Sequence, residues 1–147
     1  MDDIIHPKLQ RLYEYWAGKR GGRRMPSRAD LDPLDMAFIF GNVILVDVID
    51  ENPPRFRIRL HGTKLAQRAG YELTGKMLDE LPVTEFRTLA RQSFTAVATS
   101  GEPLHGIRNR VIDDRFARYE TVIMPLSDNG ERVDKLIIGL IYDDEKP

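Results

Sequence analysis

The side chains that most often carry chemistry are sparse in this chain of 147 residues. It has no cysteine, so disulfides, thiolate metal sites and cysteine nucleophiles are excluded. Its three histidines, His6, His61 and His105, stand far apart and lack the short spacings of zinc-binding motifs. They are interpreted as surface or strand-end histidines, and no metal site is predicted.

A hydrolytic site would need a nucleophile, a base and an acid held together in a cleft. Such a set would have to be built from Ser93, His105 and Asp113, and nothing in their spacing supports it. No catalytic residue is therefore predicted, and the chain is not expected to be an enzyme.

The densest positive charge lies in the loop Lys19-Arg-Gly-Gly-Arg-Arg24. Arginine recognises carboxylates and phosphates through its planar fork. We therefore expect Arg20, Arg23 and Arg24 to form a partner-binding surface. The structural alternative is that these arginines pair with the aspartates that follow, Asp30, Asp32 and Asp35.

The same loop leaves a second alternative open. Its Arg20-x-x-x-Arg24 spacing, together with Ser127-x-x-Gly130, resembles the motif by which PilZ domains bind cyclic di-GMP. Pro125 stands where that motif needs Asp or Asn, and about a hundred residues separate the two halves. The resemblance is therefore partial.

The composition limits which classes of binding partner and which cellular compartment we expect. The net charge of −1 gives no bulk field that would favour nucleic acid or a membrane. The longest apolar runs are far shorter than the ~20 residues that span a bilayer. The start of the chain lacks the basic and apolar segments of a signal peptide. We expect a cytoplasmic protein without membrane or nucleic-acid partners.

Hydrophobic periodicity predicts the elements of the first half. A helix from Pro7 to Gly18 carries one apolar stripe, and a short helix begins at Asp32-Pro33. Strands are predicted over 43–49 and 55–61, joined by a turn. The expected register pairs Asp47 with Arg57 on the outer face and places Phe56, Ile58 and Leu60 on the inner face.

The second half is predicted to hold short helices, one long helix and three strands. Thr63 is the expected N-cap of the short helices, and Thr84 that of the long helix, which ends at Gly101. The strands are expected over 104–112, 116–126 and 133–142. A hairpin before the long helix disfavours the NTF2-like fold, the alternative under which the chain would be a small isomerase or dehydratase.

Two strands are apolar on both faces, Val43-Ile-Leu-Val46 and Leu136-Ile-Ile-Gly-Leu-Ile-Tyr142. An antiparallel strand has that pattern only when both faces are covered. The long helix and its short neighbours would cover one face. The leading helix would cover the other, within the chain or across a dimer. The arginine-bearing strand 55–61 is expected at the sheet edge.

This order of elements resembles the PAS domain, and several segments are similar to a family of short, stand-alone bacterial PAS proteins. The segments are Tyr15-Trp16, Arg20-Gly-Gly-Arg-Arg24, Pro26 to Pro33, Phe56 to Thr63, Glu72-Leu-Thr-Gly75 and Pro125 to Asp134. The resemblance implies an α+β fold with a five-stranded antiparallel sheet. Residues 1–32 would form the leading helix and basic loop, and 33–147 the PAS domain, packed as one unit.

The resemblance also implies a sensory or regulatory module, expected to be a homodimer that signals through contact with an unknown partner protein. Flavin photoreceptors of this fold use a reactive cysteine, which is absent here. Haem versions usually take an axial histidine from the long helix, and residues 84–100 contain none, although Met77 and His61 stay open as ligands. No cofactor is predicted.

A small apolar ligand would sit between the long helix and the sheet. The alternative is a filled core with no pocket. If a pocket exists, its walls are expected to be Ile58, Leu60, Tyr71, Ser93, Phe94, Val97 and Tyr119.

Overall fold

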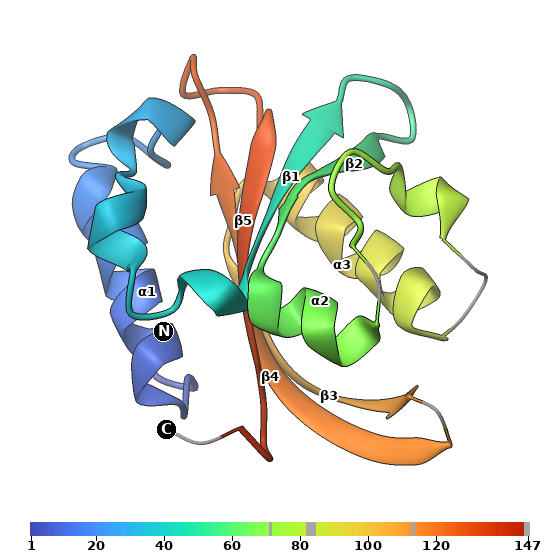
Figure 1. Cartoon of the computed structure of the whole chain (residues 1–147). Coiled ribbons are helices and arrows are strands. Elements are labelled where there is room, and N and C mark those ends of the chain that lie inside the picture. The colour runs from blue at the N-terminus through green and yellow to red at the C-terminus, as the bar shows by residue number, and fades with distance from the viewer. Residues whose placement is uncertain (71, 82–84, 113, 146–147) are drawn as a thin grey trace.

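The computed structural model describes residues 1–70, 72–81, 85–112 and 114–145. A central antiparallel sheet separates two helical layers (Figure 1). One layer holds α1 (Pro7–Lys19) and the short helices η1 (Arg28–Asp30), η2 (Pro33–Met36) and η3 (Phe40–Asn42). The other holds α2 (Thr63–Ala69), η4 (Leu78–Glu80) and α3 (Glu85–Ser100). The strands are β1 (Val43–Ile49), β2 (Arg55–His61), β3 (Leu104–Ile112), β4 (Arg115–Leu126) and β5 (Lys135–Tyr142).

The five strands lie in the order β2-β1-β5-β4-β3, which confirms the predicted five-stranded antiparallel sheet. The arginine-bearing strand β2 is at the edge, as expected. Its free side is bonded by the following loop, where the Gly75 N–H donates to the Ile58 carbonyl and the Ile58 N–H donates to the Lys76 carbonyl (2.6 and 2.8 Å). These bonds satisfy backbone groups that an open edge would expose.

A β-bulge alters the predicted hairpin. Asp47 lies opposite Arg57, as expected, but the ladder shifts between Leu45 and Val46 and leaves Arg59 as the extra residue on β2. The Asp47 carboxylate therefore binds the Nε–H of Arg59, at 3.0 Å from both oxygens. Because one added residue reverses the alternation of faces, Leu60 points to the outer face, and its predicted inner position was wrong.

The predicted helices are present with small shifts in their boundaries. Thr63 is the first residue of α2 and not its N-cap, which is Gly62. A Cβ on Gly62 would collide with the Gly41 carbonyl, so only glycine fits this close approach of two backbones. The predicted cap Thr84 lies outside the described residues. Among the described helices, none combines the length and the apolar character needed to cross a bilayer.

The leading helix α1 packs against the sheet of its own chain. Leu9, Leu12 and Trp16 are almost fully buried on its inner stripe. The site they occupy is opened by Gly139 of β5, where a Cβ would come within 2.8 Å of both leucine side chains. The Trp16 indole N–H also donates to the Pro125 carbonyl (2.8 Å), so the buried ring has its polar group satisfied.

A buried carboxylate fixes the start of the same helix. Glu120 of β4 accepts hydrogen bonds from the N–H groups of Ile5 (2.7 Å) and His6 (2.8 Å), and it contacts the His105 ring at 2.7 Å. Burial alone would raise the pKa of Glu120, but these hydrogen bonds outweigh it and hold the pKa below its ordinary value. The outer layer is thus attached to the sheet by packing at one end and by a charged acceptor at the other.

Docking of α1 can be measured through Trp16. Trp16→Ala should lower the free energy of unfolding by about 3–5 kcal/mol, since it removes a fully enclosed ring. Trp16→Phe should cost about 1–3 kcal/mol, mainly because the Pro125 carbonyl loses its donor. Urea unfolding monitored by circular dichroism would give both values.

The matched control is Leu34→Ala on the exposed surface of the same layer, which should change stability by about 0.5 kcal/mol or less. A Trp16→Ala variant as stable as this control would show that α1 is not docked.

Candidate functional site

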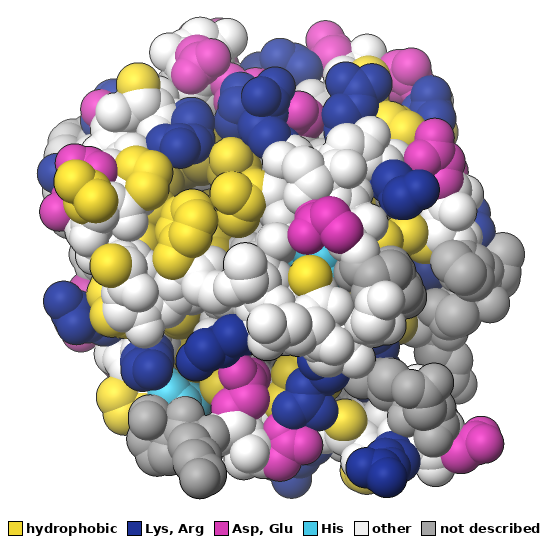
Figure 2. All heavy atoms as spheres, in the orientation of Figure 1, with side chains coloured by type: hydrophobic (Ala, Val, Ile, Leu, Met, Phe, Trp, Pro, Cys, Tyr) yellow, Lys and Arg dark blue, Asp and Glu magenta, His cyan; other side chains and the backbone are white. Residues whose placement is uncertain are grey.

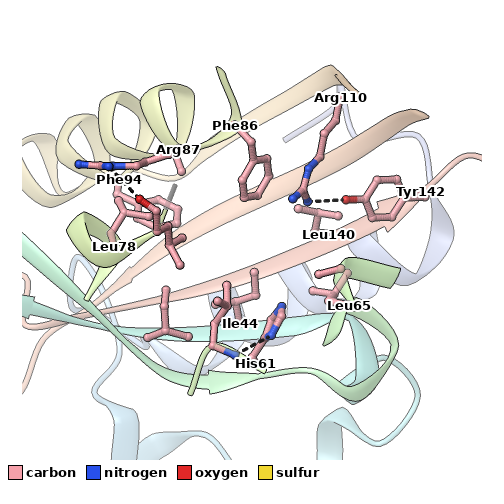
Figure 3. A pocket seen from close by; sticks show the side chains of 15 residues that line it. Ile44, His61, Leu65, Leu78, Phe86, Arg87, Phe94, Arg110, Leu140 and Tyr142 are labelled. Carbon is pink, nitrogen blue, oxygen red and sulfur yellow. Dashed lines mark hydrogen bonds between the residues drawn. The ribbon is translucent and has the colours of Figure 1, made fainter. Parts of the chain in front are cut away.

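A cavity of about 90 Å³ lies between the inner face of the sheet and the layer of α2, η4 and α3 (Figure 3). Most of its wall is apolar. The lining residues come from α2, η4 and α3 and from the strands β1, β2, β3 and β5. The polar atoms come from His61, Arg87, Arg110 and Tyr142, and no described Asp or Glu lines the cavity. The apolar lining residues are Ile44, Ile58, Leu65, Ala69, Leu73, Leu78, Leu81, Phe86, Ala90, Phe94 and Leu140.

A second hollow of about 40 Å³ adjoins the first along α3 and the middle of the sheet. Five residues line both spaces, including Phe86 and Phe94 from α3. A shift of either ring would therefore join the two hollows. The Phe94 ring is held edge-on by Phe56 of β2 at 5.5 Å between centroids, and Phe86 makes a similar contact with Tyr119 at 6.2 Å.

The alternation of side chains along each strand determines which residues of the sheet line the cavity. Ile44 of β1 and Leu140 of β5 face the cavity, while Gly139 faces α1 and Leu45 faces the short helices of the outer layer. The short helix η4 closes another side. Its residue Asp79 forms ion pairs with Arg55 of β2 (3.2 Å between Nε and Oδ2) and with Arg91 of α3. These pairs link η4 to both the sheet and the long helix.

His61 reaches the cavity because of the bulge in β2. Its ring is almost fully buried and points toward the middle of the pocket (Figure 3). The Leu73 N–H lies 3.4 Å from Nδ1 in hydrogen-bonding geometry. Burial lowers the pKa of His61, the Glu72 carboxylate at 4.0 Å opposes that shift, and the Arg110 charge reinforces it. The net pKa is below the ordinary value, so the ring is neutral at neutral pH.

Arg110 extends from β3 into the same cavity. Its guanidinium lies over the Phe86 ring, 3.9 Å from the centroid, and Nη1 donates to the Tyr142 hydroxyl at 3.0 Å (Figure 3). Over the ranges that the structure describes, no carboxylate forms an ion pair with it. The cavity therefore contains a cation that is stabilised by an aromatic face and a hydroxyl rather than by an opposite charge.

The structure brings most of the predicted pocket residues to this region. Ile58 and Phe94 line the larger cavity, while Ser93, Phe94 and Tyr119 line the smaller one. Burial raises the pKa of Tyr119 to about 12, so its hydroxyl keeps its proton. Val97 is buried in the core and lines neither space.

Leu60, like Val97, lines neither of these spaces. Leu60 lies on the opposite side of the sheet, in a small hollow with Met36 and Phe40. Figure 2 shows hydrophobic side chains gathered near the junction of the short N-terminal helices with the sheet, beside Lys and Arg side chains. The predicted wall residue Tyr71 lies outside the described residues.

Sequence reasoning missed the polar groups His61, Arg110 and Tyr142. His61 could not have been found, because alternation without a bulge turns it outward. Arg110 had a usable signal. The β3–β4 register pairs Arg108 with Tyr119, and Tyr119 was predicted to face inward, so Arg108 and Arg110 had to share that face.

The basic loop lies away from this cavity, and its arginines contact their own chain. Arg20 lies over the Trp16 ring at 5.5 Å, Arg23 pairs with Asp30 at 2.8 Å, and Arg24 donates to the Ser100 carbonyl at 2.9 Å. The pairing of Arg23 with Asp30 is one of those that the structural alternative named.

The second half of the motif that resembles the cyclic di-GMP site folds as a local turn. The Ser127 hydroxyl donates to the Asn129 side chain and accepts from the Gly130 N–H, at 3.0 and 2.9 Å. The Ser127 N–H donates to the Pro26 carbonyl (2.9 Å), so this turn packs beside the end of the basic loop. The Ser127 hydroxyl thus makes its hydrogen bonds within this turn.

The described side chains leave a small space in this cavity. A flavin ring system or a haem needs several times the space of about 90 Å³ that the side chains leave. Among the described residues, no group of three or more His, Asp or Glu side chains could hold a metal ion.

The buried histidine predicts a pH dependence of stability. Because the folded pKa of His61 is lower than the unfolded value of 6.5, the unfolded chain binds a proton that the native state excludes. The free energy of unfolding should therefore fall as the pH drops below 6.5 toward the folded pKa.

His61→Gln should lose less stability than the wild type between about pH 7.5 and pH 5.5 in urea unfolding, because it lacks this titration. Equal losses in both proteins would mean that His61 is accessible to protons in the native state.

Comparison with known proteins agrees with this geometry. Residues 4–142 match the profile of a family described as PAS domain. Among curated proteins, none matches the sequence. The structure is similar to the PAS domain of Bordetella pertussis BvgS, with a TM-score of 0.58 at 19% identity over 79% of this chain and 90% of that one.

Two further solved structures share the fold. The Rhodobacter sphaeroides LOV protein aligns with a TM-score of 0.53 at 13% identity, over 79% of this chain and 70% of that one. VqmA bound to DPO gives 0.55 at 12% identity, over 77% of this chain and 59% of that one. This chain thus spans about two thirds of the length of the Rhodobacter LOV protein and less of VqmA.

At these identities the solved structures show the fold alone. The family profile covers most of the sequence, from Ile4 to Tyr142 at the end of β5. The helix order and the five-stranded sheet agree with it. The chain belongs to the PAS-domain family.

Proposed function

We propose that this protein is a cytoplasmic sensory module that binds a small, mainly apolar molecule in the cavity under α3. The observation that carries the proposal is the cavity itself, which has an apolar wall and a few polar atoms from His61, Arg110 and Tyr142. Ligand sites generally have this composition. The solved structure of VqmA with DPO supports small-molecule binding by a protein of similar fold.

The route of the signal follows from the two faces of the central strands. Leu140 lines the cavity, and the preceding residue, Gly139, supports Leu9 and Leu12 of α1 on the other face. A ligand that shifts the β5 backbone at Leu140 would therefore also shift the backbone on which α1 rests. Tightly packed interfaces respond to such shifts by changing arrangement. The outer layer is the proposed output surface toward a partner protein.

We further propose a homodimer formed through the outer face of the β3–β4 ribbon. Val111 and Phe116 are cross-strand partners that are 65% and 72% exposed, and Ile5 is 71% exposed. Alternation along β4 puts Phe116 on the same face as Glu120, which binds the Ile5 N–H. Large apolar side chains gathered on one surface are typical of a protein interface.

Ligand binding can be tested with toluene as a neutral apolar probe. Saturable NMR shifts are expected at the methyl groups of Ile44 and Leu140, which line the cavity. Ala90→Leu, which fills both hollows, should weaken the binding by at least about tenfold, since the added methyl groups occupy the space of the ligand.

The matched control is Ala96→Leu, the same substitution at an exposed position of α3, and it should bind toluene like the wild type. If neither toluene nor a polar analogue with the same ring gives saturable shifts at Ile44 and Leu140 of the wild type, the proposed ligand site does not exist.

The dimer proposal is tested by Phe116→Glu. A charge placed in an apolar interface must be desolvated, so the variant should sediment as a monomer at concentrations where the wild type is a dimer. Ala96→Glu adds the same charge on α3 and should leave the dimer intact. A wild type that is monomeric throughout, or a Phe116→Glu variant that is still dimeric, would contradict this interface.

A further inference from the structure

We propose that the ligand is a small monocarboxylic acid, whose carboxylate is held by the Arg110 guanidinium and the Tyr142 hydroxyl. This inference rests on the proposed ligand site and names the chemical class that the site selects. It follows from the charge, the donors and the size of the cavity.

Among the described residues, the Arg110 guanidinium lacks the opposite charge that other arginines of the fold have. Several arginines around the fold pair with an aspartate: Arg59 with Asp47, Arg68 with Asp144, and Arg118 with Asp143. Arg110, by contrast, enters an apolar cavity and has no such partner among the described residues. Arg110 is partly buried, so its charge loses some hydration without gaining a counter-ion from the described residues, and the Phe86 ring offsets part of that loss. An anion in the cavity would complete the pairing.

A further argument is the set of available donors. A guanidinium has five N–H groups, and the Tyr142 hydroxyl is the one acceptor found for Arg110 among the described residues. That hydroxyl accepts from Arg110, so its own proton is available for a second acceptor. An arginine fork beside a hydroxyl donor matches the two oxygens of a carboxylate. The Tyr119–Tyr142 ring contact, with centroids 5.5 Å apart, helps to fix this geometry.

The described charged groups in the cavity wall are positive. The polar groups in the wall are the Arg110 and Arg87 guanidinia, the His61 ring and the Tyr142 hydroxyl, and no described acidic side chain lines the space. Arg87 lies at the other side of the pocket and donates to the Leu81 carbonyl (2.8 Å), as Figure 3 shows. In a cavity of low dielectric constant these charges favour an anion and disfavour a cation.

Size and wall chemistry select the rest of the ligand. Between Arg110 and the sheet the wall is formed by apolar side chains such as Ile44, Ile58 and Leu140. Free phosphate would leave this apolar surface unmatched. A volume of about 90 Å³, extended by the adjoining hollow, accommodates one ring or a short branched chain. A single carboxylate on such an apolar body satisfies both parts of the site.

The test compares benzoate with benzamide, which has nearly the same shape without the charge, by isothermal titration calorimetry at neutral pH. The wild type should bind benzoate at least about tenfold more tightly, because a hydrogen bond to a charged group is worth about 1.5–3 kcal/mol, or roughly 10–100-fold. Arg110→Met should reduce benzoate affinity by a factor in this range and leave benzamide affinity within about threefold.

Two further variants distinguish the contribution of directed hydrogen bonds from that of the positive charge. Arg110→Lys should recover only part of the benzoate affinity, since an ammonium lacks the bidentate fork. Tyr142→Phe should weaken benzoate more than benzamide, because it removes the second donor. Arg57→Met, at an exposed position on the opposite face of β2, is the control and should bind like the wild type. Thermal melting confirms that each variant is folded.

The outcomes distinguish the inference from the proposed function. If benzamide or toluene binds in the cavity as tightly as benzoate, or if Arg110→Met and Arg110→Lys leave the benzoate affinity unchanged, the carboxylate inference is wrong while the ligand site stands. If benzoate, benzamide and toluene all fail to bind the wild type, the proposed ligand site fails and the inference fails with it.

Discussion

The central strands β1 and β5 are apolar on both faces, and the rest of the structure depends on covering both. On one face α1 packs directly against the backbone at Gly139, and Trp16 fills the space beside it. On the other face the cover is made of shorter pieces, α2 and η4, beside one long helix. The cavity lies where α2, η4 and α3 meet the inner face of the sheet.

Polar groups at the inner face give the cavity its chemical character. Most polar side chains of the chain are placed at the surface or in pairs, such as Glu120 with the N-terminal N–H groups. Arg110 is different, because it is partly buried beside an apolar space and no described carboxylate forms an ion pair with it. A charged group without a counter-ion in such a cleft is a candidate for ligand binding. The proposed ligand, a small carboxylic acid, would supply the counter-ion that Arg110 lacks among the described residues.

Much of the fold could be predicted from the sequence, because its signals are local. The alternation in β2, the helical stripe of α1 and the two-faced pattern of β5 each follow from one short segment. The candidate site was less accessible. One extra residue, Arg59, exchanges the faces of Leu60 and His61, and a bulge leaves no mark in the hydrophobic pattern. The inward direction of Arg110 required combining the register of β3 and β4 with the predicted position of Tyr119. The hydrogen bond between Arg110 and Tyr142 joins strands that are not neighbours in the sheet, and no local pattern indicates it.

The most direct test of this account is a crystal structure of the protein grown with benzoate. The account predicts electron density for one benzoate between α3 and the sheet, with both carboxylate oxygens within hydrogen-bond distance of the Arg110 guanidinium or the Tyr142 hydroxyl. Its ring should contact Ile44 and Leu140. An empty inner cavity, or a benzoate whose carboxylate points away from Arg110, would contradict the account.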